Sequence, residues 1–261
     1  MLRLVKSAIR SNKSLYQTLV PIWARIRGPG PDGPQEFPWE TERFQAYCEA
    51  VGKRVENPFF VKVGANDGVS GDPCCHIFLE NNAWHGILVE PVPYVFALLK
   101  ENFSDSDRFT LKQLAVGSGP IGEATFYYID KSATEHMPDL PSWYDRIGSF
   151  DRTHITNHLP DVGPYIIEAK VQTMPLVTLL EQEAVKDIHV LHIDTEGFDY
   201  EVLKSIDLAK NKPLCIFVEH SNVDKETRQA MASLLKSNGY RVRDCGRDYF
   251  AVNREFDRRL G

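Results

Sequence analysis

The chain has little of the positive charge that a nucleic-acid-binding protein needs. Its 30 lysines and arginines are outnumbered by 36 aspartates and glutamates, so the formal net charge is -6. Because binding to a phosphate backbone depends on a basic surface, we expect no nucleic-acid partner. Long apolar runs are missing too, since none approaches the roughly 18 residues of a membrane-spanning helix.

Cysteine is scarce, and its spacing suits neither disulfides nor zinc. The five cysteines are odd in number and scattered, and Cys74 and Cys75 are adjacent, which is too constrained for an ordinary disulfide. No Cys-x-x-Cys spacing indicates a structural zinc site. We therefore expect reduced, inert thiols, no bound metal and a cytoplasmic location.

Residues 59–91 form the most informative segment. The apolar run 59–63 leads into the turn Gly64-Ala65-Asn66-Asp67-Gly68, and a second apolar run, 86–89, ends at Glu90-Pro91. This order is typical of half a nucleotide-binding α/β sheet. Glycines permit positive φ and close approach to a ligand, and an acid at the next strand tip can accept hydrogen bonds from a ribose diol.

What this turn lacks narrows the choice of nucleotide. A dinucleotide fingerprint needs glycine where this turn has Asn66, because that glycine makes room for a pyrophosphate. No Gly-Lys-Ser/Thr sequence that could cradle a triphosphate occurs in the chain. S-adenosylmethionine fits better, since it has a ribose and an adenine but no phosphate.

The first 34 residues differ from the rest of the chain. Residues 1–31 are basic and contain no acid, and their apolar residues are spaced for an amphipathic helix. Residues 28–34 alternate glycine and proline, as a linker does. We expect an arm over 1–34 and one catalytic domain over 35–261. The helix could pack on its own domain, form a homo-oligomer, or make peripheral membrane contact.

Alternating strand and helix patterns fill the core and predict a parallel sheet with helices on both faces. The expected fold class is α/β, with a seven-stranded, mostly parallel sheet that ends in a C-terminal antiparallel hairpin. Such a hairpin is unusual for dinucleotide enzymes and is typical of a Rossmann-like methyltransferase fold. An added antiparallel strand is expected over 123–129. The seven predicted sheet strands are 59–63, 86–89, 109–116, 188–193, 214–218, 240–245 and 248–252, and the helices are 76–84, 94–103, 177–184, 198–206 and 225–238.

Apolar periodicity fails over residues 131–164. A structureless insertion of this length in a compact domain usually serves as a functional lid, and an idle surface loop is the alternative. We expect a substrate lid, in which His154 and His158 could reach an acceptor.

Acidic residues stand at the ends of several predicted strands. Asp194 and Glu196 follow one strand, and Glu219 ends the next and is followed by His220. Since ligands bind beyond the carboxyl ends of strands in an open parallel sheet, we expect Gly64, Glu90, Asp194 and Glu219 to border one crevice.

Three blocks in order carry a family resemblance. They are residues 60–68 (FVKVGANDG), 86–91 (GILVEP) and 191–203 (LHIDTEGFDYEVL). On them the chain resembles the FkbM family of S-adenosylmethionine-dependent methyltransferases over roughly residues 59–252. The sequence departs from the family at Lys62, where an acid is common.

The resemblance implies S-adenosylmethionine as cofactor and O-methylation of a small-molecule or saccharide hydroxyl. It also implies that glycines and Asn66 of the turn line the methionine part, that Glu90 holds the ribose, and that residues 115–116 lie near adenine. The predicted cofactor-binding residues are Gly64, Ala65, Asn66, Asp67, Gly68, Glu90, Pro91, Ala115 and Val116.

Methyl transfer to oxygen is an in-line displacement, so positioning and removal of the hydroxyl proton are the main tasks. Asp194 is the first candidate for orienting the acceptor or taking its proton, and a helix N-cap is its alternative role. Glu196, Glu219 and His220 follow. Asp194, Glu196 and Asp199 could instead collect a divalent ion, although acids at a helix start also favour the macrodipole.

Two other function classes stay open at this point. An NAD-linked oxidoreductase would share the sheet, and a catalytically silent nucleoside-binding module would share the pocket. The sequence does not identify the acceptor.

Overall fold

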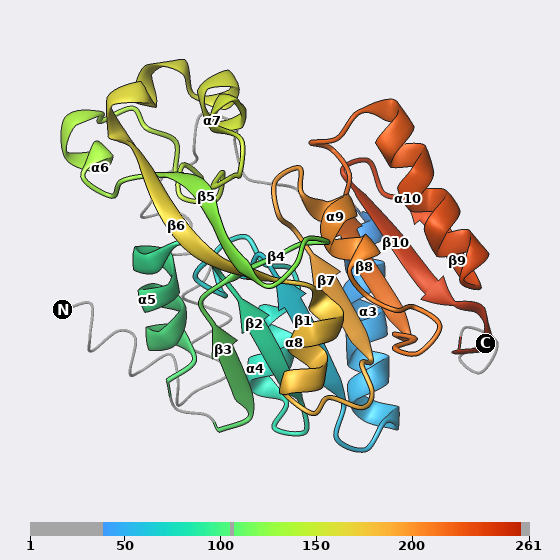
Figure 1. Ribbon diagram of the computed structural model, residues 1–261. Coiled ribbons are helices and arrows are strands. Elements are labelled where there is room, and N and C mark those ends of the chain that lie inside the picture. The colour runs from blue at the N-terminus through green and yellow to red at the C-terminus, as the bar shows by residue number, and fades with distance from the viewer. Residues whose placement is uncertain (1–38, 105–106, 257–261) are drawn as a thin grey trace. The chain divides into compact units, whose positions relative to one another are not determined.

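The computed structural model describes residues 39–104 and 107–256 (Figure 1). The predicted arm of residues 1–34 lies outside these described residues. The chain divides into two compact units, and the larger, Phe37–Pro138 with Trp143–Gly261, contains all the elements discussed below. None of the described helices is long and apolar enough to cross a bilayer.

The main sheet confirms the predicted fold class. In the described part of the chain, seven strands are ordered β3-β2-β1-β7-β8-β10-β9. All neighbours from β3 to β8 are parallel, and β10 is antiparallel to both β8 and β9. The turn between β9 and β10 is too short for a parallel crossover. The strands are β1 Phe59–Val63, β2 His85–Val89, β3 Phe109–Lys112, β7 Val190–Ile193, β8 Cys215–Glu219, β9 Tyr240–Asp244 and β10 Asp248–Asn253.

Helices cover both faces of this sheet because side chains alternate along each strand. On β1, Val61 and Val63 join a core cluster with helices α8 (Leu176–Gln182), α9 (Asp199–Lys204) and α10 (Lys225–Ser237). Phe60 points to the other face and joins the cluster of α3 (Trp39–Arg54), α4 (Cys75–Glu80) and α5 (Pro93–Asn102). In Figure 1, α8 lies in front of the sheet and α3 behind it. The sequence analysis did not predict α3.

A second, three-stranded sheet has the order β4-β6-β5. Its strands are β4 (Ala115–Val116), β5 (Gly122–Ile129) and β6 (Ile166–Met174), and β5 pairs antiparallel with β6 along its whole length. The predicted added strand is therefore present, but its partner β6 was missed. The predicted strand 109–116 is wrong as one element: β3 ends at Lys112, and β4 joins the second sheet.

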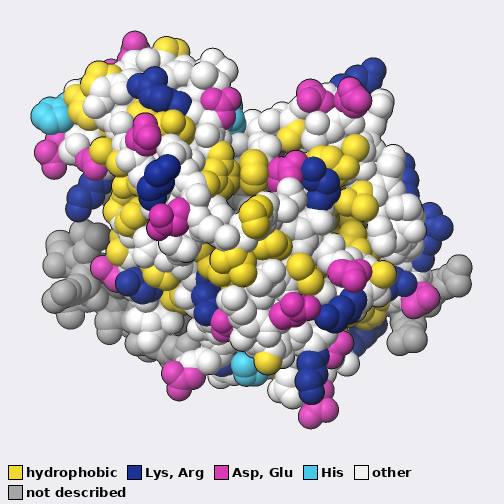
Figure 2. Space-filling view, in the orientation of Figure 1, with side chains coloured by type: hydrophobic (Ala, Val, Ile, Leu, Met, Phe, Trp, Pro, Cys, Tyr) yellow, Lys and Arg dark blue, Asp and Glu magenta, His cyan; other side chains and the backbone are white. Residues whose placement is uncertain are grey.

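The insertion between β5 and β6 has more structure than predicted. It contains α6 (Ala133–His136), α7 (Arg152–His158) and a 3-10 helix, η1 (Pro160–Tyr165). Asp151 caps α7 by accepting a hydrogen bond from the Thr153 amide at 2.8 Å. Figure 2 shows the surface notched between this insertion and the side of α10.

Gly64 should be intolerant of a side chain. Its φ is +78°, and an added Cβ would lie 1.7 Å from the carbonyl oxygen of Asp194. We expect Gly64→Ala to lower the free energy of unfolding by more than about 2 kcal/mol, because the backbone strain of an alanine at positive φ adds to the steric clash of its Cβ. Gly119→Ala is the matched control, since nothing lies within 4 Å of its Cβ position. Urea denaturation measures both variants, and equal effects would contradict the close approach.

Candidate functional site

A pocket opens at the carboxyl ends of β1, β2 and β7. The empty space among its lining atoms is about 820 Å³, a volume that includes space open to solvent. The predicted site residues that line it are Gly64, Ala65, Asn66, Glu90, Pro91, Ala115, Val116, Asp194 and Glu196. The structure thus brings together residues from blocks more than a hundred positions apart.

Glu90 is held in one orientation by two backbone amides. Its Oε2 accepts from the amide of Asn66 and its Oε1 from the amide of Val92, each at 2.9 Å. Burial raises the pKa of Glu90 to about 7, although both hydrogen bonds act to lower it. Each carboxylate oxygen has a second lone pair, so Glu90 can accept further hydrogen bonds from a ligand in the pocket.

The turn after β1 is shaped by its own side chains. Asn66 has φ +50°, a conformation that asparagine tolerates, and its Nδ2 donates to the carbonyl oxygen of Asp145 at 3.4 Å. Asp67 Oδ1 accepts from the amides of Val69 and Ser70, at 2.9 and 2.6 Å. Asp67 therefore closes the loop and does not line the pocket.

Gly68 likewise lies behind the pocket lining. An added Cβ would lie 2.4 Å from the Phe103 ring and 2.6 Å from Leu99, both on the side of α5. Close packing of the turn on this helix explains the glycine. For Asp67 and Gly68, contact with a cofactor stays a prediction.

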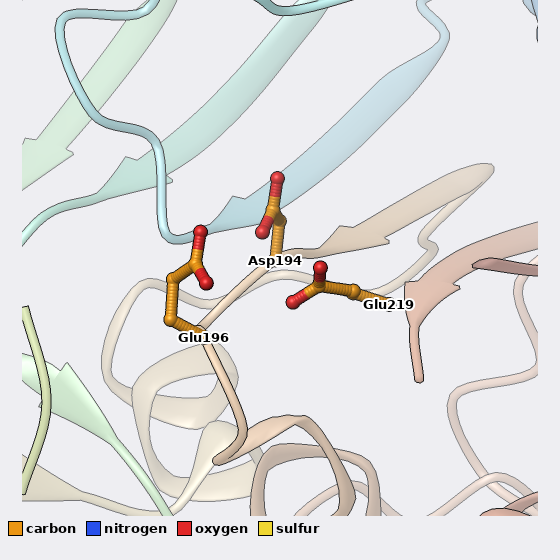
Figure 3. Close-up of side chains that lie close together, drawn as sticks. All are labelled: Asp194, Glu196 and Glu219. Atoms are coloured by element: carbon orange, nitrogen blue, oxygen red, sulfur yellow. The ribbon is translucent and has the colours of Figure 1, made fainter. Parts of the chain in front are cut away.

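Three carboxylates gather at the ends of β7 and β8. Asp194 and Glu196 lie on the loop after β7, and Glu219 is the last residue of β8. One oxygen from each lies within 4.8 Å of the others, and Figure 3 shows the side chains turned toward one another. Although Asp194 is exposed to the pocket, desolvation raises its pKa well above the usual range, and Glu219 and Glu196 raise it further.

Hydrogen bonds distinguish these carboxylates. Glu219 is buried and accepts from Ser221 Oγ at 2.6 Å, Asn222 Nδ2 at 3.0 Å and Arg247 Nη2 at 3.0 Å. The same Asn222 amide donates to Glu196 at 2.7 Å. Asp194 makes no side-chain hydrogen bond or ion pair with the described residues. Asp194 is thus the acid of the three that is available to a ligand, while Glu219 is fully engaged beside the pocket.

Asp194 does not cap α9, so that alternative is wrong. The helix has Phe198 at its N-cap, without a side-chain cap, and the Asp199 carboxylate accepts from the amides of Thr195 at 2.9 Å and Gly197 at 3.0 Å. Asp199 therefore holds the loop and does not belong to the cluster that the sequence analysis proposed. The third carboxylate beside Asp194 and Glu196 is that of Glu219. Three such oxygens suit a hard divalent cation, but acid clusters are common without one.

The histidines fall into two groups. His154 lies on α7 with its Nε2 3.7 Å from Glu196 Oε2, so the insertion reaches the acidic cluster. His220 is buried outside the pocket lining, with its Nε2 3.2 Å from Asp244 Oδ1 and its ring against Tyr249. His158 contacts the carbonyl oxygen of His154.

A buried ion pair at the pocket was missed by the sequence analysis. Lys62 pairs with Asp72, and its Nζ lies 3.3 Å from His192 Nδ1. Burial acts to raise the pKa of Asp72, but the Lys62 ammonium, His192 and the amide of Cys74 together outweigh it and lower that pKa to about 2. Burial, with Lys62 adding to it, lowers the pKa of His192 to about 3. His192 is thus a core residue, and the lysine in the apolar strand was the signal for a buried acidic partner.

The sequence of residues 62–242 matches the methyltransferase FkbM domain. The chain belongs to this family. The family resemblance inferred from the three blocks is confirmed, and the sheet has the methyltransferase arrangement predicted from it. An NAD-linked oxidoreductase is thereby not supported.

Solved structures similar to this FkbM-family chain have low sequence identity to it. Methyltransferase FkbM from Methylobacillus flagellatus KT is 12% identical, with a TM-score of 0.46 and coverage of 76% of this chain and 44% of that chain. Precorrin-6y C5,15-methyltransferase from Geobacter metallireducens GS-15 is 10% identical, with a TM-score of 0.39 and coverage of 80% and 86%. The chain thus spans less than half of the first structure's length. No curated protein sequence matches it.

Removing one charge of the Lys62–Asp72 pair should destabilise the fold more than removing both charges. Asp72→Asn leaves the Lys62 ammonium buried without a counter-charge, so we expect the free energy of unfolding at pH 7 to fall by about 3–5 kcal/mol. The double variant Lys62→Met with Asp72→Asn should recover most of that loss. Urea unfolding of both decides, and a double variant no more stable than the single one contradicts the interpretation.

Proposed function

We propose that this FkbM-family methyltransferase uses S-adenosylmethionine to methylate a hydroxyl group of a saccharide or natural-product acceptor. One observation carries the proposal. A single pocket joins Glu90, fixed by two amides, to the Asp194 carboxylate, which has no side-chain partner among the described residues. The first suits a ribose diol and the second a hydroxyl that must lose its proton.

The residues present fit the proposed donor. Glu90 would accept hydrogen bonds from the ribose, and the buried apolar residues Leu114, Ala115 and Val116 would lie against the adenine. The backbone of the turn at Gly64 would lie beside the methionine part. When bound, the donor supplies an electrophilic methyl group on a sulfonium.

Asp194 would act as the general base. An alcohol is a weak nucleophile while protonated, and a carboxylate with a raised pKa is a better proton acceptor near neutral pH. Its neighbours Glu196 and Glu219 keep that pKa high, and Asn222 fixes both of them. The insertion would complete the acceptor side, since His154 reaches Glu196 from α7.

Calorimetry and an acceptor screen test the whole proposal. S-adenosylhomocysteine should bind and NAD should not, and a radiolabelled methyl donor should label a hydroxyl among saccharide and lipid-linked saccharide acceptors. Binding of S-adenosylhomocysteine without methylation of any acceptor would favour the silent nucleoside-binding module. The predicted membrane contact and homo-oligomer depend on residues outside the described ones.

Asp194→Asn should lower kcat by roughly two to four orders of magnitude and leave S-adenosylhomocysteine affinity in place, because only the proton acceptor is removed. A second variant, Glu219→Gln, tests whether the pKa of Asp194 controls the rate. It removes a negative charge that raises the Asp194 pKa, so the fall in kcat on the acid side should move to lower pH. Steady-state rates from pH 5 to 9 measure both effects, and an Asp194→Asn enzyme of normal rate disproves the base role.

Donor affinity should depend on the charge of Glu90. The ionised carboxylate accepts hydrogen bonds from both ribose hydroxyls, and its pKa of about 7 means that this form is lost as pH falls through neutrality. We expect S-adenosylhomocysteine to bind about tenfold more weakly at pH 6 than at pH 8. Glu90→Gln should bind weakly with little pH dependence.

The matched control is Asp248→Asn, because the pKa of Asp248 is also raised to about 7, by burial and by Glu219, yet this residue lies outside the pocket lining. The control should keep the wild-type pH dependence of affinity. A pH-independent wild type would argue against Glu90 as the ribose ligand.

A further inference from the structure

An arginine of the insertion lines the proposed donor pocket. Arg146 lies between α6 and α7. Its Nε is buried and has no hydrogen-bond acceptor among the described residues. The guanidinium makes no hydrogen bond or ion pair with the residues that the structure describes. A partly buried cation in this state lacks the counter-charge that normally offsets its desolvation.

The guanidinium of Arg146 packs against a glycine. Gly71 has φ +74°, and a Cβ added there would lie 2.3 Å from Arg146 Nη1 and 2.9 Å from its Cζ. The absence of a side chain at Gly71 leaves room for the guanidinium at this place. Gly71 itself lines the pocket, as do its neighbours Ser70 and Asp72.

The segment carrying Arg146 is also tied to the turn after β1. The carbonyl oxygen of Asp145 accepts from Asn66 Nδ2 at 3.4 Å, and Asn66 donates its own amide to Glu90. Lys62, the lysine in the pocket lining, is already paired with Asp72. Arg146 is therefore the pocket cation that is left for an anionic ligand group.

The geometry points to Arg146 as the residue that binds the α-carboxylate of the donor. This inference depends on the proposed function, because the α-carboxylate is the anionic group of S-adenosylmethionine. A guanidinium fork matches a carboxylate with two parallel hydrogen bonds. The insertion then contributes to donor binding as well as to acceptor choice.

Two ligands separate this role from a general effect on the pocket. S-adenosylhomocysteine has the amino-acid end, whereas 5′-methylthioadenosine keeps the nucleoside and lacks the carboxylate. Charged hydrogen bonds contribute about 1.5–3 kcal/mol, which corresponds to roughly 10- to 150-fold in affinity. Calorimetry with the full chain should show Arg146→Gln binding S-adenosylhomocysteine weaker by that factor, with methylthioadenosine affinity unchanged.

Two further variants complete the experiment. Arg146→Lys keeps the positive charge but lacks the forked guanidinium, so its loss of S-adenosylhomocysteine affinity should be smaller. This variant replaces Arg146→Gln in the comparison if the glutamine variant fails to fold. Arg152→Gln is the matched control, because Arg152 lies on the same insertion, is exposed and, within residues 39–104 and 107–256, donates only to the carbonyl oxygen of Gly163. It should bind both ligands as the wild type does.

The outcomes are distinguishable. If Arg146→Gln leaves S-adenosylhomocysteine affinity unchanged, or weakens both ligands equally, the carboxylate assignment is overturned while the proposed function stands. If the wild-type protein binds neither ligand, the proposed function fails, and the assignment fails with it.

Discussion

The close approach of two strand ends organises this molecule. Val63 and Ile193 are register partners, and the amide of Asp194 donates to the carbonyl oxygen of Val63 at 3.0 Å. The next residue on β1, Gly64, passes against the Asp194 carbonyl with no room for a Cβ. This contact sets the distance between the turn after β1 and the acidic loop after β7. Both faces of the pocket, the one with Glu90 and the one with Asp194, depend on it.

Three buried acids around the site lower the stability of the fold near neutral pH. The pKa values of Glu90, Asp199 and Asp248 are all raised to about 7, mainly by burial. The contribution of such a group to the free energy of unfolding is complete below its unfolded pKa of about 4, where the group is protonated in both states. This contribution is lost as pH rises through about 7. These three acids therefore make the fold less stable at neutral pH than at acidic pH.

Much of the fold and part of the site could be predicted from the sequence, for a physical reason. The strands of the main sheet are local apolar runs, and the rule that ligands bind at their carboxyl ends places Glu90 and Asp194 together. Strand β6 was missed although it alternates apolar and polar residues as a half-buried strand does, because it directly follows an aperiodic segment. Its pairing with β5 joins positions far apart in the sequence, and no local pattern specifies that pairing. Helix α3 carries a weak apolar stripe among many charged residues.

The side-chain partners could not be predicted, because they depend on contacts between distant positions. Lys62 stood out as a departure from the family pattern, but nothing in the loop sequence marked Asp72 as its partner. The engagement of Glu219 depends on Arg247, from the turn before β10, and the place of the Arg146 guanidinium is next to Gly71, on a different segment of the chain. These contacts form only when the folded chain brings distant positions together.

The β5–β6 ribbon has a consequence for how this enzyme could diversify. Its paired ends, Ile129 and Ile166, close the insertion at its base, so the two stems stay joined whatever lies between them. The part of the insertion that does not reach the pocket can therefore change in length at little entropic penalty, since the ribbon already joins its ends. Asp145, Arg146 and His154 set the limit of such change, because they reach the turn after β1, the pocket and Glu196.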